Sequence, residues 1–100
     1  MTSRKKFKED VEALSREIGV DVKEVHLRQM KRKWASCSSS GRLTFDPSLL
    51  GQPDETRLRA VLHELLHLRY PNHGKMFNVM LQAYLYKQGV DAENTDGAKS

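Results

Sequence analysis

Apolar residues recur at helical spacing near both ends of this 100-residue chain. The first stripe is followed by Gly19 and consists of Phe7, Val11, Leu14 and Ile18. The second begins after Gly74 and consists of Phe77, Met80, Leu81, Tyr84 and Leu85. Such spacing lines up apolar side chains on one face of a helix, and glycine is a common helix end. We therefore predict an amphipathic helix that ends at Gly19 and a last helix that ends at Gly89.

Between these helices the pattern first alternates, as it does in strands. Val25 and Leu27 alternate with polar neighbours, which predicts a half-buried strand. Residues 34–38 and 42–45 predict two further short strands, and the tract Ser39-Ser40-Gly41 between them is turn-forming. The sequence therefore predicts a small three-stranded sheet that includes a hairpin.

The next segment has one apolar and one polar face when it is drawn as a helix. Residues 53–55 (Pro-Asp-Glu) are typical of a first helical turn, where proline is tolerated and carboxylates meet the positive end of the helix dipole. Ala60, His63, Glu64 and His67 fall in an arc of about 100°, separate from an apolar arc of about 160°. The apolar positions are Leu58, Val61, Leu62, Leu65, Leu66 and Leu68. One face therefore suits a core and the other suits a cleft.

The polar face carries the sequence H-E-x-x-H at positions 63–67, and His73 follows after five residues. Residues four apart on a helix are offset by about 40°, so His63 and His67 can bind one metal ion. Glu64 is offset by about 100° from His63, which leaves its carboxylate free to act on water. With His73 as third ligand, the metal keeps the open position of a catalytic zinc site. A metal-free histidine pair is the competing interpretation, and the two-faced helix favours the metal.

The residues between His67 and His73 predict how the third ligand reaches the metal. In a straight helix His73 would point away from the site and lie about 9 Å further along the axis. Pro71 disfavours helical geometry at Tyr70, and Asn72 tolerates turn conformations. We therefore expect the helix to end near Arg69 or Tyr70, and a turn to bring His73 back.

Composition indicates a single small domain. We assign it to residues 1–88 and predict that the polar stretch 89–100 is a flexible tail. No apolar stretch is long enough to cross a membrane, and no apolar signal core follows the basic start. Cys37 is the only cysteine, so we expect no disulfide and a cytoplasmic location. None of these features predicts the oligomeric state.

The net charge of +4 is concentrated in two basic clusters, at residues 4–8 and 31–33. Such clusters can contact nucleic acid, but a solvated surface is the commoner explanation. Six apolar or sulfur-containing side chains that follow the second basic cluster or lie near it and His73 in the sequence are predicted to belong to the core. These are Trp34, Cys37, Met30, Met76, Met80 and Phe77, whereas His26 is predicted to be exposed.

Three segments together carry a resemblance to a known family. They are residues 30–38 (Met-Lys-Arg-Lys-Trp-Ala-Ser-Cys-Ser), the H-E-x-x-H segment, and residues 72–77 (Asn-His-Gly-Lys-Met-Phe). Across residues 26–85 the chain resembles the YgjP-like family of small zinc metallopeptidases, which is similar in plan to the SprT and WLM proteases. That family usually has glycine where this chain has Ala35 and serine where it has Gly74, and these departures concern the rim of the cleft.

The resemblance implies an α+β fold of the minimal zincin type, with an N-terminal helix, a three-stranded sheet, the zinc helix, a turn and a C-terminal helix. It implies one Zn²⁺ held by His63, His67 and His73. Peptide or protein substrates would be hydrolysed by a zinc-activated water with Glu64 as general base. Residues 34–38 would form the strand at the edge of the cleft, where an extended peptide pairs with it.

Other zinc enzymes share this ligand spacing. Metzincins have glycine three residues after the second histidine, where this chain has Tyr70. YbeY-like endoribonucleases usually have glycine at the position of Glu64, and a glutamate there favours attack on a carbonyl. Nucleic-acid hydrolysis is therefore the second interpretation, supported only by the basic clusters. An inactive zinc-binding module is the third, and Glu64 argues against it because a structural site needs no such carboxylate.

The tail adds one hypothesis about regulation. It carries Asp91, Glu93 and Asp96, and carboxylates are good ligands for zinc. We therefore consider that the tail folds over the cleft and damps activity, the alternative being a plain solvated chain.

Overall fold

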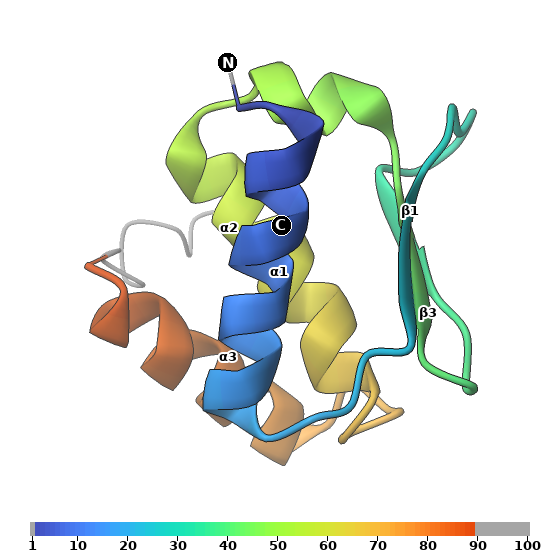
Figure 1. The fold of residues 1–100 in the computed structure, drawn as a ribbon. Helices are drawn as coiled ribbons and strands as arrows, with labels where there is room; N and C mark the ends of the chain where they lie inside the picture. Colours follow the sequence, from blue (N-terminus) through green and yellow to red (C-terminus); the bar gives the residue numbers. More distant parts are fainter. Residues whose placement is uncertain (1, 90–100) are drawn as a thin grey trace.

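The computed structural model describes residues 2–89 of the chain. The elements in order are α1 (Arg4–Ile18), β1 (Glu24–Leu27), β2 (Ala35–Cys37), β3 (Arg42–Phe45), the 3-10 helix η1 (Pro47–Gly51), α2 (Asp54–His67) and α3 (Lys75–Lys87). The three α-helices lie to one side of the small sheet (Figure 1). The predicted α+β arrangement and order of elements are therefore confirmed.

The sheet has the strand order β1-β3-β2, with β3 in the centre. β2 and β3 form the predicted antiparallel hairpin, in which Ala35 lies opposite Phe45. β1 pairs in parallel with β3, from Glu24 opposite Arg42 to Leu27 opposite Phe45. This order leaves β2 at the edge of the sheet.

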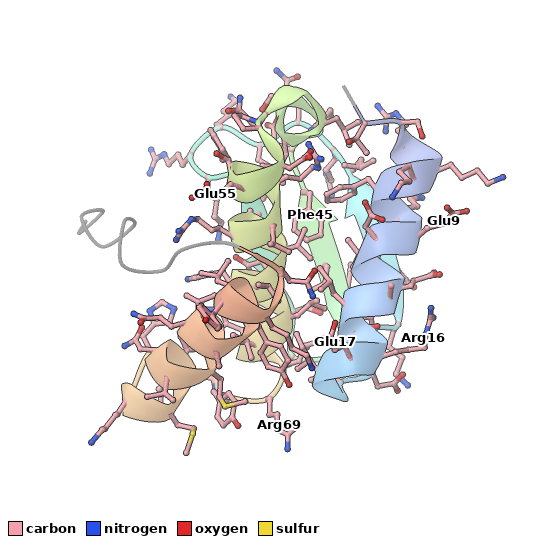
Figure 2. All side chains as sticks on the ribbon, turned by 90° about the vertical axis from the view of Figure 1, so that its left-hand side faces the viewer. Glu9, Arg16, Glu17, Phe45, Glu55 and Arg69 are labelled. Carbon is pink, nitrogen blue, oxygen red and sulfur yellow. The ribbon has the colours of Figure 1, made fainter. Side chains whose placement is uncertain are left out.

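Helix α1 has the boundaries that its apolar stripe predicts. The Ser3 side chain accepts a hydrogen bond from the Lys6 N–H, and Gly19 ends the helix at a φ of 85°, which favours glycine. Phe7 is buried, and its ring meets the Phe45 ring edge-on at a centroid distance of 5.1 Å. Figure 2 shows Phe45 pointing from the sheet toward the helices. The apolar face of α1 therefore packs against the central strand.

Helix α2 buries the apolar face that the sequence predicts, including Leu62, Leu65 and Leu66. It begins at Asp54, directly after Pro53, and ends at His67, two residues before the predicted end at Arg69. The reason is a tightening of the last turn: the Leu68 and Arg69 N–H groups donate to carbonyls three residues back. Arg69 then donates to the Ile18 carbonyl at 3.0 Å, which ties the end of α2 to the end of α1.

Two of the predicted core residues are exposed. Trp34 is 43% exposed and Met76 is 55% exposed, so these assignments are wrong. Trp34 lies one residue before β2, where its carbonyl accepts from the Asp46 N–H just beyond β3 while its side chain is only partly covered. Met76 is offset by about 100° from Phe77 on α3, and only the face with Phe77 is buried. Phe77 is buried and His26 is exposed, as predicted.

Among residues 2–89, no helix is long and apolar enough to cross a membrane. The tail residues Asp91, Glu93 and Asp96 lie outside the described residues. The hypothesis that the tail folds over the cleft concerns these residues.

Candidate metal centre

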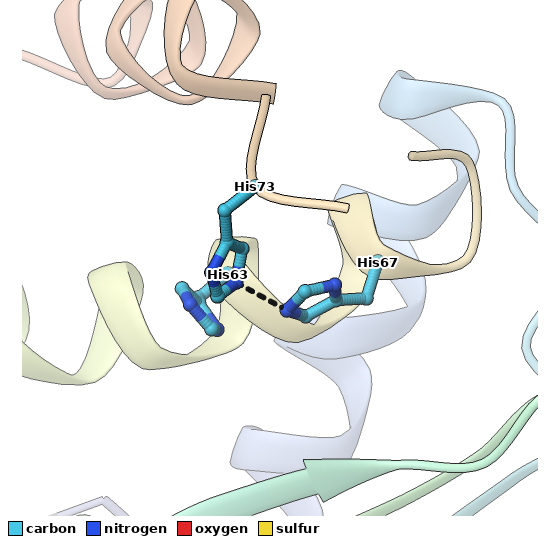
Figure 3. A group of neighbouring side chains, drawn as sticks. All are labelled: His63, His67 and His73. Carbon is cyan, nitrogen blue, oxygen red and sulfur yellow. Dashed lines mark hydrogen bonds between the residues drawn. The ribbon is translucent and has the colours of Figure 1, made fainter. Parts of the chain in front are cut away.

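Helix α2 and the segment that follows it bring three histidines together. His63 and His67 lie one turn apart on α2, and His73 approaches them from the segment before α3 (Figure 3). One ring nitrogen from each residue lies within 4.8 Å of the corresponding nitrogens of the other two. The three residues that the sequence predicts as ligands are therefore neighbours in space.

The turn after α2 accounts for the position of His73. The Tyr70 N–H donates to the Leu66 carbonyl at 2.7 Å, which closes the last turn before Pro71. Beyond Pro71 the chain reverses, and the His73 Nε2 atom lies 2.8 Å from the His67 Nε2 atom. One of these two nitrogens donates to the other, depending on the tautomers. The predicted return of the chain at Pro71 is confirmed.

The donor set fits a zinc ion. Tetrahedral zinc with Zn–N bonds of about 2.0–2.1 Å holds its ligand nitrogens about 3.3 Å apart. The two Nε2 atoms at 2.8 Å need only a small outward rotation of the rings to reach that separation. Burial of the His67 ring, and then the neighbouring His63, hold the pKa of His67 below its ordinary value. The neutral imidazole is the form that binds a metal.

A fourth ring, Phe77 at the start of α3, packs against the three imidazoles. Its centroid lies 5.3 Å from that of His63, 4.9 Å from that of His67 and 4.8 Å from that of His73. Phe77 is 2% exposed. The sequence identified it as a core residue but not as part of the site. The only signal was its place four residues after His73, in the first turn of the next helix.

Glu64 is one of two buried polar or charged residues in the described part of the chain. Its side chain lines the cleft, and its Oε2 atom lies 3.2 Å from His63 Nδ1. Glu64 does not belong to the group of converging ligand atoms. This agrees with the offset of about 100° that separates it from His63 on the helix.

The site opens into a cleft of about 760 Å³ between α2 and β2. One wall comes from residues 33–39, in and around β2, and the other from Ala60, Leu68 and the site residues of α2. Cys37 lies in the first wall, but it is not in the ligand group. Burial, and then the Glu64 carboxylate, raise the pKa of the Cys37 thiol. The thiol is therefore protonated at neutral pH, which disfavours it as a zinc ligand.

The wall formed by β2 presents backbone hydrogen-bonding groups to the cleft side. The Trp34 carbonyl accepts from the Asp46 N–H, and the Ser38 N–H donates to the Arg42 carbonyl, so these residues face β3. Because successive residues of a strand face opposite edges, the backbone groups of Ala35 and Cys37 point to the other edge. No strand within residues 2–89 pairs with that edge. An extended chain can therefore add to β2 there.

Comparison with known proteins gives a matching family and similar solved structures. The YgjP-like metallopeptidase domain matches residues 2–88 of the chain. No curated protein matches the sequence. The crystal structure of the metallopeptidase zymogen of Pyrococcus abyssi abylysin is similar, with a TM-score of 0.65 and 23% sequence identity, over 83% of this chain and 96% of that chain. At this identity the likeness shows a shared fold. The match over residues 2–88 shows that the chain belongs to the YgjP-like metallopeptidase family.

Proposed function

We propose that residues 1–88 form a zinc-dependent peptidase domain that hydrolyses peptide bonds in peptide or protein substrates. His63, His67 and His73 are its metal ligands, and Glu64 is its general base. The observation that carries this proposal is the convergence of three imidazoles beside a buried carboxylate, with His63, His67 and Glu64 lining an open cleft. Family membership supports peptidase chemistry at this site.

Each site residue has a separate task in the proposed reaction. When bound, zinc lowers the pKa of a coordinated water and polarises the carbonyl of the bond to be cleaved. Glu64 Oε2 accepts the proton of the attacking water and returns it to the leaving amine. Glu64 is suited to this because it is buried beside the ligands without belonging to their group. The contact of Oε2 with His63 Nδ1 holds the carboxylate at the ligands.

The cleft wall supports an extended peptide as substrate. The edge of β2 that is unpaired within residues 2–89 offers the backbone groups of Ala35 and Cys37, and His63 and His67 lie on the opposite wall. A peptide paired with β2 therefore passes its backbone carbonyls in front of the metal ligands. Nucleic acid has no backbone pattern of N–H and C=O groups to match a strand edge, which favours peptide over nucleic-acid hydrolysis.

Glu64→Gln tests the assignment of the base. Glutamine has nearly the same shape but cannot accept the proton, so we expect zinc content and melting temperature to stay near those of the unmodified protein while peptide cleavage is lost. A general base typically contributes about 10²–10⁴-fold to the rate. Cleavage is measured with a quenched peptide library, and nuclease activity with single- and double-stranded oligonucleotides.

Glu9→Gln is the matched control, because Glu9 is exposed on α1 (Figure 2) and does not line the cleft between α2 and β2. This variant should cleave like the unmodified protein. Loss of zinc in Glu64→Gln would make the residue a ligand instead. Retained cleavage would remove it from the reaction, and oligonucleotide hydrolysis that depends on Glu64 would favour a nuclease.

A further inference from the structure

The connection between β1 and β2 is strongly basic. Its residues 28–33 are here called the basic loop. The charged residues of this loop are Arg28, Lys31, Arg32 and Lys33. All four are exposed, and the loop contains no acidic residue. None of the four forms an ion pair with another residue in the described range 2–89. Their positive charge is therefore available to a bound molecule.

Hydrogen bonds to β3 and Asp46 hold the basic loop at both ends. The Arg28 N–H donates to the Phe45 carbonyl at 3.0 Å, and the Met30 N–H donates to Asp46 Oδ2 at 2.8 Å. On the other side of the loop, the Asp46 N–H donates to the Trp34 carbonyl at 2.9 Å. Residues 31–33 are thus held between two hydrogen bonds to Asp46.

The loop ends in the wall of the cleft. Lys33 and Trp34 both line it, next to the edge strand. Apart from the histidines, the only charged residues of the lining are Lys33 and the buried Glu64. Trp34 leaves 43% of its surface exposed there. Exposed tryptophan is enriched at binding surfaces, and Lys33 adds a positive charge beside it.

We propose that the basic loop makes this site selective for acidic peptides, with Asp or Glu close to the bond that is cleaved. The inference rests on the proposed peptidase function and names its substrate class. A peptide paired with the edge at Ala35 and Cys37 passes within reach of Lys33, which lies in the same wall two residues before Ala35. Lys31 and Arg32 add to the positive potential at that end, which attracts acidic chains.

The test measures binding without catalysis. Trp34 is the only tryptophan, so its fluorescence reports occupancy of the cleft. The zinc-loaded Glu64→Gln protein is titrated with three end-blocked peptides of equal length, which carry Glu, Gln or Lys on both sides of a central Leu-Leu bond. The Glu peptide should bind about fivefold more tightly than the Gln peptide, and the Lys peptide more weakly, as expected for exposed ion pairs. The difference should shrink at high salt.

Charge reversal assigns the selectivity to the loop. In the same background, Lys31→Glu, Arg32→Glu and Lys33→Glu together should reverse the order of the three peptides. The matched control is Arg4→Glu, Lys5→Glu and Lys8→Glu, which makes the same change of net charge at exposed residues of α1 that form no ion pair within residues 2–89. α1 contributes no residue to the cleft, so this control should keep the original order.

The outcomes separate this inference from the peptidase function. Equal affinities for the three peptides, or an equal effect of both triple variants, would overturn the acidic selectivity. Tighter binding of a single-stranded oligonucleotide than of the Glu peptide, abolished by the loop variant, would assign the loop to nucleic acid instead. If the three peptides bind with the predicted order of affinities but the unmodified protein never cleaves acidic peptides, the charge selectivity of the basic loop would be supported and the peptidase function contradicted.

Discussion

The ring of Phe77 touches all three histidines while almost none of its own surface reaches solvent. An apolar ring in this place limits how far each imidazole can rotate. It also covers one side of the group, whereas His73 is exposed on another side. Groups that orient metal ligands affect metal affinity although they do not bind the metal. Phe77 therefore acts as a positioning residue for the proposed zinc site.

Phe77→Leu should weaken zinc binding about tenfold, the range seen when groups that support metal ligands are changed. Leucine keeps an apolar side chain but cannot contact all three rings. The measurement is a competition titration of zinc against a chromophoric chelator. Phe7→Leu is the control, because Phe7 is equally buried but packs against Phe45. It should lower the melting temperature and leave zinc affinity unchanged. Equal zinc affinity in both variants would contradict the positioning role.

Strand β2 is the edge strand that lines the cleft, and it is the element with which we propose a peptide substrate pairs. Its position at the edge of the sheet follows from the pairing of β1 with β3, which places β3 in the centre. The local sequence predicted the hairpin, because its turn lies between adjacent segments. It did not predict the partner of β1, because that pairing joins segments far apart in the sequence and leaves no local signal.

Cys37→Pro tests the edge of β2. Proline removes the N–H that points away from β3, so the hairpin stays intact and only the proposed bond to the peptide is lost. We expect the KM for peptide cleavage to rise roughly fivefold, as for one hydrogen bond of about 1 kcal/mol. Cys37→Ala is the control for the lost thiol and should retain the original KM. An unchanged KM in the proline variant with unchanged fold would show that peptides do not pair with this edge.

The two walls of the cleft come from different layers of the molecule, the helices and the sheet. α2 supplies the ligands and β2 supplies the rim, and α1 packs on the central strand behind them. The periodic stripes predicted the helices because burial on one face selects apolar residues at that spacing. Periodicity did not predict the exposure of Trp34, because the alternation of apolar and polar residues does not show whether a side chain just outside the end of a strand is covered.

Zinc should also stabilise the molecule, because its ligands join α2 to the segment that leads into α3. Within residues 2–89, the polar side-chain contacts between α1 and the end of α3 are those of Lys87 and Gln88 with Glu17, at the surface. At free zinc of about 100 times Kd, binding stabilises the folded state by roughly 2.7 kcal/mol. Chelation should therefore lower the melting temperature and speed amide exchange in α3. A melting temperature and exchange rates that chelation leaves unchanged would contradict a metal link between these helices.

If His63, His67 and His73 form one zinc site, elemental analysis of the purified protein should find the metal. We predict one zinc per chain in the unmodified protein and in His26→Ala, which removes an exposed histidine outside the site. His67→Ala and His73→Ala should each lose most of the metal while remaining folded by circular dichroism. Full zinc occupancy in His73→Ala would remove that residue from the site, and no zinc in the unmodified protein after reconstitution would contradict the account.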